Sequence, residues 1–404
     1  MATATSARPT AAQPCRASVS LETGLRVAGL FAGIGGVELG LHRAGHRSLL
    51  LNEIEPGAQA VLHARFPDVE LTGDVSDLRS LPDVDLVAAG FPCQDLSQAG
   101  RTLGIGGNRS GLVDHVFRLL ETAHPSWLLL ENVPFMLQLD RGRAMQHLTA
   151  ELGRLGFRWA YRVVDARSFG IPQRRQRVLL LASRDHDPRP VLFADDAGEP
   201  RERDPVGLAC GFYWTEGIRG LGWAIDAVPT LKGGSTIGIP SPPAIWMPDG
   251  LVGTPDVRDA ERLQGFPTDW TVADGPITSR RTGARWKMVG NAVCVPVAQW
   301  VGERLTTPGT FDDTLSHPLP GSRWPRAAWG EGDQAFAVGV SLWPLAKWRP
   351  HLVDFLDHPA HPLSVRATEG FLGRTDRSSL RFPAGFLDVL RRHLKNMEGR
   401  PAAW

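Results

Sequence analysis

Short apolar runs alternate with amphipathic stretches over the first half of the chain. The apolar runs predict buried strands at 26–31, 48–52, 84–89, 127–131 and 178–183. The stretches between them have helical spacing and predict helices at 37–44, 56–66, 112–123 and 144–155. Because strands alternate with helices, we expect an α/β fold with a doubly wound, mostly parallel sheet. Ligands of such sheets bind beyond the carboxyl ends of the strands, so the residues that follow each strand are candidates for a functional site.

The pattern changes at several points, which divide the chain into segments. Residues 1–24 lack periodicity and predict a flexible tail, whereas residues 25–184 hold the strand and helix alternation. Residues 185–257 are rich in glycine and proline, which predicts a smaller irregular lobe. Residues 306–404 are expected to be a Pro/Gly/Ser-rich linker and a C-terminal extension of unknown role. Within that extension a helix is predicted at 386–395, with one apolar face formed by Phe386, Leu387, Leu390 and Leu394.

Composition narrows the class of protein without naming a function. The 404 residues are 42% hydrophobic and 22% charged, as in soluble globular proteins, and the net charge is only +1. The chain therefore does not belong to the nucleic-acid-binding proteins that are basic over their whole surface, although a local basic cleft is compatible with this charge. No apolar run approaches the length of a membrane span and the N-terminus has no secretory signal, so we expect a cytoplasmic protein. The four cysteines are too far apart for a zinc motif, so no metal is expected.

Three elements that follow successive strands indicate a nucleoside site. The first strand ends in Phe-Ala-Gly-Ile-Gly-Gly at 31–36, and these glycines let the backbone approach a ligand. Glu53 is placed for a ribose diol, Ile54 for one face of an adenine and Asp74 for the adenine amine. The glycine spacing is not G-x-G-x-x-G, which disfavours a nicotinamide dinucleotide. Glycines without a pyrophosphate pattern indicate a nucleoside that carries a sulfonium amino acid, which is S-adenosylmethionine.

A second group of reactive side chains follows the later strands. Cys93 stands in a proline-restricted turn, and the glycine-rich stretch 94–111 behind it predicts a lid. A thiol there is a candidate nucleophile, although a lone cysteine is more often a small core residue. Glu131 ends an apolar strand and is either half of a structural ion pair or a proton donor. Arg175 and Arg177 alternate to the same side and form either a solvated charge run or an anion-binding pair.

Eight blocks of the chain, in a fixed order, resemble the DNA (cytosine-5) methyltransferases of prokaryotes. The blocks lie at 31–36, 52–55, 73–74, 90–94, 131–133, 173–177, 262–267 and 289–296. The resemblance implies a Rossmann-like, S-adenosylmethionine-dependent methyltransferase fold. It also implies that residues 185–257 form a target-recognition lobe and that residues 258–305 return to the catalytic domain. It does not cover residues 306–404.

The resemblance further implies a covalent mechanism. The thiolate matching Cys93 adds to C6 of a flipped cytosine, which makes C5 a nucleophile for the methyl group of S-adenosylmethionine. The carboxyl group matching Glu131 binds and protonates N3, while Arg177, with Arg175 nearby, holds the O2 edge. Loss of the C5 proton and of the thiolate then restores the aromatic ring.

Contacts with the cofactor and with DNA are carried over from the same resemblance. The residues expected around the cofactor are Phe31, Gly33, Gly35, Gly36, Glu53, Ile54, Asp74, Pro92, Asn291 and Val293. Ile54 stands where the family often has an aromatic residue, which should weaken adenine stacking. The residues expected to contact DNA are Gln94, Ser97, Arg109, Lys232, Arg280 and Arg281.

Other functions compete with DNA methylation. A branch of the same family methylates cytosine in tRNA, but a sizeable variable lobe favours sequence readout in a DNA groove. A non-catalytic DNA-binding or regulatory relative is disfavoured by the presence of Cys93, Glu131 and Arg177. A nicotinamide oxidoreductase explains none of the later blocks. We therefore expect a monomer that methylates specific double-stranded DNA, alone or in a restriction-modification or other anti-phage system with a cognate defence protein as partner.

Overall fold

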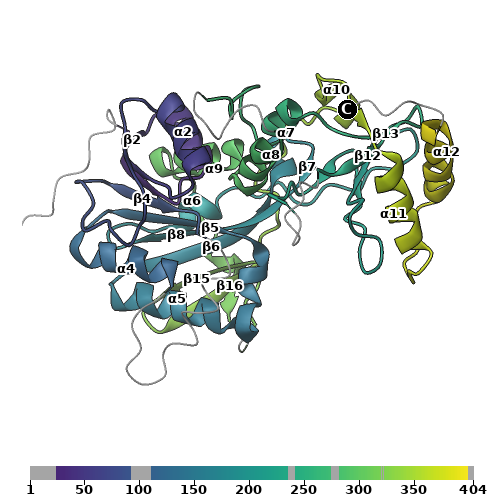
Figure 1. Ribbon diagram of the computed structural model, residues 1–404. Coiled ribbons are helices and arrows are strands. Elements are labelled where there is room, and N and C mark those ends of the chain that lie inside the picture. Colours follow the sequence, from purple (N-terminus) through teal and green to yellow (C-terminus); the bar gives the residue numbers. More distant parts are fainter. Residues whose placement is uncertain are drawn as a thin grey trace, which may run out of the picture.

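The protein folds into two lobes (Figure 1). The computed structural model describes residues 24–91, 111–234, 242–273, 282–319, 321 and 323–398. The larger lobe contains a ten-stranded sheet with the strand order β14-β16-β15-β6-β8-β5-β4-β1-β2-β3. The smaller lobe contains a five-stranded sheet, and a two-stranded ladder of β7 (Gln173–Arg174) and β11 (Val228–Pro229) lies between the two sheets.

The large sheet has a parallel half and an antiparallel half. The parallel half consists of β1 (Arg26–Leu30), β2 (Arg47–Asn52), β3 (Glu70–Thr72), β4 (Leu86–Ala89) and β5 (Trp127–Asn132). The antiparallel half consists of β8 (Gln176–Ser183), β6 (Arg158–Asp165), β15 (Ala327–Glu331), β16 (Gln334–Val338) and β14 (Ser316–Pro318). The two halves meet where β5 pairs with β8.

Helices cover both faces of the large sheet. α1 (Gly36–Arg43), α6 (Arg189–Leu192) and α9 (Val295–Thr306) pack on one face. α4 (Leu112–Thr122) and α5 (Arg143–Arg154) pack on the other and lie below the sheet in Figure 1. Successive residues of β1 belong to different hydrophobic cores, because the side chains of a strand alternate between its two faces. Ala28 packs under α4 and α5, and Val27 packs under α1 and α9. No helix in the described part of the chain has the length and apolar character to cross a membrane.

The α/β fold with a sheet covered on both faces is confirmed. The predicted strands and helices of the first half coincide with β1, α1, β2, α2 (Pro56–Arg65), β4, α4, β5, α5 and β8 to within two residues at each end. The predicted helix at 386–395 is confirmed as α12 (Phe386–Glu398), in which Phe386 and Leu390 are fully buried. Local periodicity suffices for these elements because each buries one regular face.

Strand β6 was not predicted from the pattern, and a buried charge explains why. Arg162 interrupts the apolar run of this strand, yet its side chain is fully buried. Its guanidinium donates to the backbone oxygens of Ser341, Leu192 and Asp195 and pairs with the carboxylate of Asp196. A buried arginine is tolerated only where such partners surround it, and these partners come from distant parts of the chain.

The smaller lobe combines two distant parts of the chain. Its sheet has the order β10-β9-β12-β13-β17, formed by β10 (Ala224–Ile225), β9 (Cys210–Phe212), β12 (Ala244–Trp246), β13 (Val252–Thr254) and β17 (His361–Pro362). α11 (Val365–Thr375) and α12 cover this sheet. The ring centroid of Phe212 lies 5.4 Å from that of Phe371 and 4.9 Å from that of Phe386.

Residues 306–404 therefore differ from the expected linker and separate extension. After the short helix η4 (Asp313–Leu315), strands β14, β15 and β16 extend the large sheet, while residues 361–398 complete the smaller lobe. β15 pairs with the edge of β6, which would otherwise present unpaired backbone groups. The C-terminal helices likewise pack on apolar side chains of β9, β12 and β13 and bury them.

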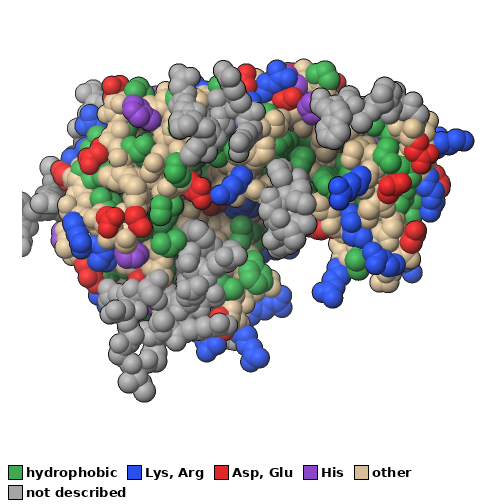
Figure 2. All heavy atoms as spheres, viewed as in Figure 1, with side chains coloured by type: hydrophobic (Ala, Val, Ile, Leu, Met, Phe, Trp, Pro, Cys, Tyr) green, Lys and Arg blue, Asp and Glu red, His purple; other side chains and the backbone are tan. Residues whose placement is uncertain are grey.

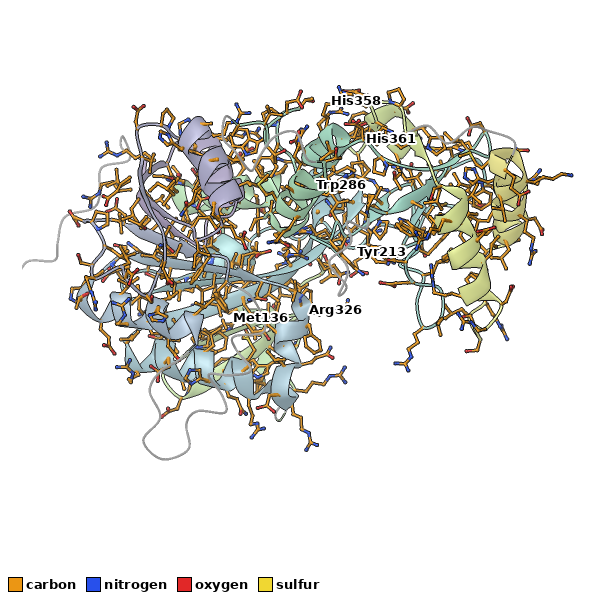
Figure 3. The ribbon with its side chains drawn as sticks, in the orientation of Figure 1. Met136, Tyr213, Trp286, Arg326, His358 and His361 are labelled. Carbon is orange, nitrogen blue, oxygen red and sulfur yellow. The ribbon has the colours of Figure 1, made fainter. Side chains whose placement is uncertain are left out.

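The two lobes share a hydrophobic junction. Around the β7–β11 ladder pack α2, α7 (Val257–Leu263), α8 (Thr282–Asn291) and α10 (Leu352–Phe355). Trp286 of α8, labelled in Figure 3, is buried in this junction together with Val228 and Leu352. Two histidines labelled in the same figure hold the C-terminal segment to α7: His358 lies 3.3 Å from Asp259, and His361 lies 3.3 Å from Asp256.

A substitution at Gly40 would test how closely α1 packs against α9. A Cβ atom at Gly40 would lie 2.6 Å from the Cβ of Ala298 and 2.6 Å from the backbone oxygen of Val295. We expect Gly40→Ala to lower the free energy of unfolding by about 1–3 kcal/mol, because neither neighbour is the end of a flexible side chain. Gly153→Ala on α5 is the matched control: no atom lies within 4 Å of its new Cβ, so it should add about 0.5–1 kcal/mol. Urea unfolding measures both values, and equal effects would contradict the packing account.

Glu38 predicts a pH dependence of stability. It lies in the first turn of α1, is buried, and its Oε2 has no hydrogen-bond partner among the described residues. Burial, with a smaller contribution from the charge of Glu53, raises the pKa of Glu38 to about 7. Between the ordinary glutamate pKa of about 4.3 and this value, the folded state keeps a proton that the unfolded chain releases. Stability should therefore fall as the pH rises through this window.

The variant Glu38→Gln should remove this slope. At pH 8 we expect it to be about 3 kcal/mol more stable than the parent chain, with little difference at pH 4. Urea unfolding at pH 4, 6 and 8 measures both chains. The same slope in the variant would assign the pH dependence to other groups.

Candidate active site

A cavity of about 850 Å³ lies at the carboxyl edge of the parallel half of the large sheet. Its walls come from the residues after β1, β2, β3, β4 and β5, from the start of β8 and from α8. Candidate residues from the sequence that line it are Phe31, Gly33, Glu53, Ile54, Asp74, Glu131, Arg177 and Asn291. Parallel strands end at the same edge, so side chains far apart in the chain meet there.

The loop after β1 is held in an unusual backbone conformation. Phe31 and Gly33 have positive φ angles of 56° and 58°. The indole N–H of Trp270 donates to the backbone oxygen of Ile34 over 2.8 Å, which anchors the loop from behind. No atom lies within 4 Å of the position of a Cβ on Gly33, so a ligand can approach the backbone at this point.

Gly35 and Gly36 serve packing and do not line the cavity. A Cβ on Gly35 would lie 2.5 Å from the ring of Phe66, and one on Gly36 would lie 2.4 Å from the backbone oxygen of Val293. Val293 likewise contributes its backbone to this contact and is absent from the cavity wall. These contacts show that Gly35, Gly36 and Val293 pack closely where the glycine loop enters α1, and their expected contact with the cofactor stays a prediction.

Glu53 organises the wall next to the glycine loop. Its Oε2 accepts from the backbone N–H of Gly33 over 2.7 Å, and its Oε1 accepts from the N–H of Glu55 over 2.8 Å. Burial raises the pKa of Glu53, and these two amides oppose that rise. Ile54 follows with 62% of its surface exposed, and Asp74 accepts from the backbone N–H of Ser76 over 2.8 Å. Glu53 and Asp74 thus present carboxylates, and Ile54 an apolar face, to one cavity.

Glu131 and Arg177 form an ion pair in the same cavity. Arg177 Nε lies 2.8 Å from Glu131 Oε1, and both side chains are nearly buried. The other oxygen, Oε2, lies 3.8 Å from the position that a Cβ on Gly90 would take. Because Gly90 lacks that side chain and itself lines the cavity, Oε2 is left open toward a ligand.

Asn132 is a structural residue to which the sequence analysis assigned no role. Its side-chain amide donates to the backbone oxygen of Phe91 over 2.9 Å, and its Oδ1 accepts from the N–H of Val133 over 2.8 Å. It therefore fixes the last described residue before Pro92 and Cys93. Its position in the Glu131-Asn132-Val133 motif, at the end of a strand, is the signal in the sequence.

Arg175 lies away from the cavity, which corrects the expected pairing with Arg177 at an anion site. Its side chain is 2% exposed and donates to the backbone oxygens of Leu231 over 3.0 Å and of Ala292 over 2.6 Å. Burial, followed by the charge of Arg177, lowers the pKa of Arg175 to about 9. The predicted alternation fails here because β8 begins only at Gln176, so Arg175 belongs to the irregular link between β7 and β8.

Of the candidate residues expected later in the chain, only some lie at the cavity. Asn291 lines the cavity at the end of α8, where Lys287 pairs with Glu55 over 3.2 Å. Lys232 belongs to the loop after β11; its Nζ lies 2.6 Å from Glu216 and 3.7 Å from the ring centroid of Tyr213. Seven candidates lie outside the described residues: Pro92, Cys93, Gln94, Ser97, Arg109, Arg280 and Arg281.

The surface is hollowed between the two lobes. Figure 2 shows Lys and Arg side chains on both sides of this hollow, and Figure 3 places Tyr213 on the side of the smaller lobe and Met136 on the side of the larger one.

The two cysteines that the structure describes, Cys210 and Cys294, are buried, and burial raises their pKa values to about 11 and about 12. Neither is therefore a reactive thiol.

Comparison with known proteins identifies the family of the chain. The family model described as C-5 cytosine-specific DNA methylase matches residues 25–200 and 256–307. The Type II methyltransferase M2.BsuMI of Bacillus subtilis (strain 168) is 50% identical over 91% of this chain and 98% of that protein. M.NlaX of Neisseria lactamica, also named a Type II methyltransferase, is 31% identical over 69% of this chain and 96% of that protein.

A solved structure shares the fold. The crystal structure of the Dnmt2 methyltransferase of S. pombe superimposes with a TM-score of 0.52 and 18% identity, and covers 70% of this chain and 97% of that one. The match to the family model and the identity to M2.BsuMI over nearly the whole chain are sufficient to place the protein. The chain belongs to the family of C-5 cytosine-specific DNA methylases.

Proposed function

We propose that the chain transfers the methyl group of S-adenosylmethionine to C5 of a flipped cytosine in a specific duplex DNA sequence, through a covalent bond from Cys93 to C6. The observation that carries the proposal is that a single cavity collects two kinds of residue. The glycine loop, Glu53 and Asp74 suit a nucleoside, and the Glu131–Arg177 pair suits the polar edge of a base. The two reactants of a methyl transfer would therefore meet inside one cavity.

The cavity residues fit S-adenosylmethionine. The backbone at Gly33 is open to a ligand, and Glu53 keeps lone pairs for ribose hydroxyls because a carboxylate has about four acceptor positions. Ile54 would cover one face of the adenine, and Asp74 would accept from its amine. A volume of about 850 Å³ lies within the range of sites for ligands of this size. The cofactor supplies an electrophilic methyl group.

Glu131 and Arg177 would hold the cytosine. Arg177 occupies Oε1 of Glu131, which leaves Oε2 to bind N3 and the exocyclic amine of the base. A remaining N–H group of Arg177 would bind O2 of the base. The pair thus orients the ring and balances the charge that develops on it during attack at C6.

The covalent steps follow from the chemistry of cytosine. The Cys93 thiolate forms a bond to C6, the electrons of the 5,6 double bond move toward C5, and Glu131 gives a proton to N3. C5 would then take the methyl group, with S-adenosylhomocysteine as the leaving group. A base removes the C5 proton, the thiolate leaves and N3 returns its proton to Glu131, which restores the 5,6 double bond and the neutral ring. The assignment of Cys93 rests on its motif. The hydrogen bond from the Asn132 amide to the backbone oxygen of Phe91 supports it, because this bond fixes the backbone two residues before Cys93.

The smaller lobe would read the DNA sequence. It lies across the hollow from the catalytic lobe, and residues 361–398 belong to it as well as residues 210–234 and 242–254. Lys232 would exchange its partner Glu216 for a DNA phosphate. Because M2.BsuMI and M.NlaX are named Type II methyltransferases, we infer that this chain modifies DNA in a restriction-modification system beside a cognate nuclease.

The first test is bisulfite sequencing of DNA from cells that express the chain. We expect protected cytosines in one short motif, and their loss in Cys93→Ala, with methyl transfer reduced at least about a thousandfold because the nucleophile is gone. Cys15→Ala is the matched control and should keep full activity. Methyl transfer to tRNA but not to duplex DNA would instead support the tRNA alternative.

A second test separates the base pocket from the cofactor pocket. We expect Glu131→Gln to reduce single-turnover methyl transfer by about 10²–10⁴-fold, since the amide cannot protonate N3. The affinity for S-adenosylhomocysteine, measured by calorimetry, should stay within about twofold of the parent value. Glu303→Gln, an exposed change on α9, is the control. A loss of S-adenosylhomocysteine binding in Glu131→Gln would show that the ion pair supports the cofactor side.

A further inference from the structure

A second cavity, of about 520 Å³, shares no lining residue with the candidate active site. It is walled by η3 (Ala166–Phe169), the exposed segment 197–203 and the segment 343–349 of the larger lobe, and by Ile225 of the smaller lobe. Figure 3 labels Arg326, whose ion pair with Glu199 lies at this cavity over 3.5 Å.

The lining is rich in cations. Five basic side chains face two carboxylates, those of Glu199 and Glu202; the basic ones are Arg167, Arg201, Arg203, Lys347 and Arg349. Arg167 is neutralised by Asp165 over 2.9 Å, and Arg203 pairs with Asp226. Lys347 and Arg201 are exposed and form no ion pair within the described residues. The cavity therefore keeps a positive surplus after its internal pairs are counted.

Arg349 is incompletely satisfied. Its Nη1 is buried and has no hydrogen-bond partner among the described residues. Burial, and then the charges of Arg203 and Arg167, lower its pKa to about 10. Arg162 is the instructive contrast, because all three nitrogens of its buried guanidinium have oxygen partners. A buried guanidinium N–H without an acceptor is costly, and a bound anion would supply that acceptor.

An aromatic surface lies beside these cations. Trp348 lines the cavity and is 83% exposed, although its backbone packs closely on Gly170. Trp343, in the same wall, has the guanidinium of Arg167 5.5 Å from its ring centroid. An exposed tryptophan next to unpaired cations is the combination that binds a phosphate and stacks a base at the same time.

We propose that this cavity binds a nucleotide unit, with its phosphate on Arg349 and Lys347 and its base on Trp348. Such a unit has two sources, a free nucleotide and a single strand of nucleic acid. The ligand would contact both lobes, because Ile225 and the Arg203–Asp226 pair belong to the same junction. This site is independent of the methyl transfer proposed above, since none of its residues lines the first cavity.

The test measures binding of inorganic pyrophosphate and of thymidine 5′-diphosphate to the full chain by calorimetry, at constant ionic strength. The pyrimidine nucleotide is chosen because it does not match an adenosine site. We expect saturable binding of both probes, with thymidine diphosphate about tenfold tighter because of stacking. Trp348→Ala should remove that difference and leave pyrophosphate binding unchanged.

Variants that remove one positive charge test whether Arg349 and Lys347 bind the phosphate. Arg349→Met should weaken pyrophosphate about tenfold or more, and Lys347→Met several-fold. Because Lys347 is exposed, its variant stays informative even if Arg349→Met does not fold. Lys395→Met, an exposed change on α12, is the matched control and should leave binding unchanged. Equal pyrophosphate binding in the parent, Lys347→Met and Lys395→Met would overturn the proposal, as would the absence of saturable binding.

An oligonucleotide distinguishes the two sources. Binding of a thymidine octamer that depends on Lys347 and Trp348 would assign the site to a nucleic-acid strand. Binding of thymidine diphosphate with the same dependence, but no such dependence for the octamer, would assign it to a free nucleotide. Thymidine diphosphate no tighter than pyrophosphate would overturn the stacking role of Trp348.

Discussion

The antiparallel pairing of β5 with β8 is the constraint on which the candidate site depends. The parallel strands all end at one edge, and β8 runs against β5, so the end of β5 meets the start of β8. Glu131 and Arg177 thereby face each other, with Nε and Oε1 2.8 Å apart. A parallel β8 would have brought Ser183 to this edge instead and left Glu131 as a buried carboxylate without its cation. The change from parallel to antiparallel pairing at β8 thus forms the Glu131–Arg177 ion pair and stabilises the buried charge of Glu131.

Buried arginines connect the parts around that edge. Arg175 holds the loop at Leu231 to Ala292 after α8, and Arg162 holds β6 to the segments at Asp195 and Ser341. Most of the acceptors are backbone oxygens, so each arginine fixes the path of the chain as well as its own charge. Removing an acceptor segment would leave a buried cation, which explains how distant segments are kept in place. Arg175 Nε and Arg349 Nη1 both lack a hydrogen-bond partner among the described residues, but Arg349 differs because it lines the second cavity.

The C-terminal residues show how one segment can serve two lobes. β15 covers the edge of β6, and α11 and α12 cover the sheet of the smaller lobe. Between them in the sequence, the segment 343–349 forms part of the wall of the second cavity. The family match at 25–200 and 256–307 includes neither part, yet the match to M2.BsuMI extends over 91% of the chain. The extension is therefore an integral part of both sheets of this protein.

The amino-acid sequence by itself determined the α/β core and most of the cavity wall. Strands such as β1 and β5 bury regular apolar faces, and Glu53, Asp74 and Glu131 lie at or just after the ends of strands, so local pattern is sufficient to locate them. Only the tertiary structure decided that Arg175 turns away from the cavity, that β6 is a strand and that the C-terminal residues divide between two sheets. The deciding partners are remote in the sequence: Ala292, a partner of Arg175, and Ser341, a partner of Arg162, lie more than a hundred residues away. A local pattern contains no information about such partners, because a buried charge or an edge strand is stable only once they are in place.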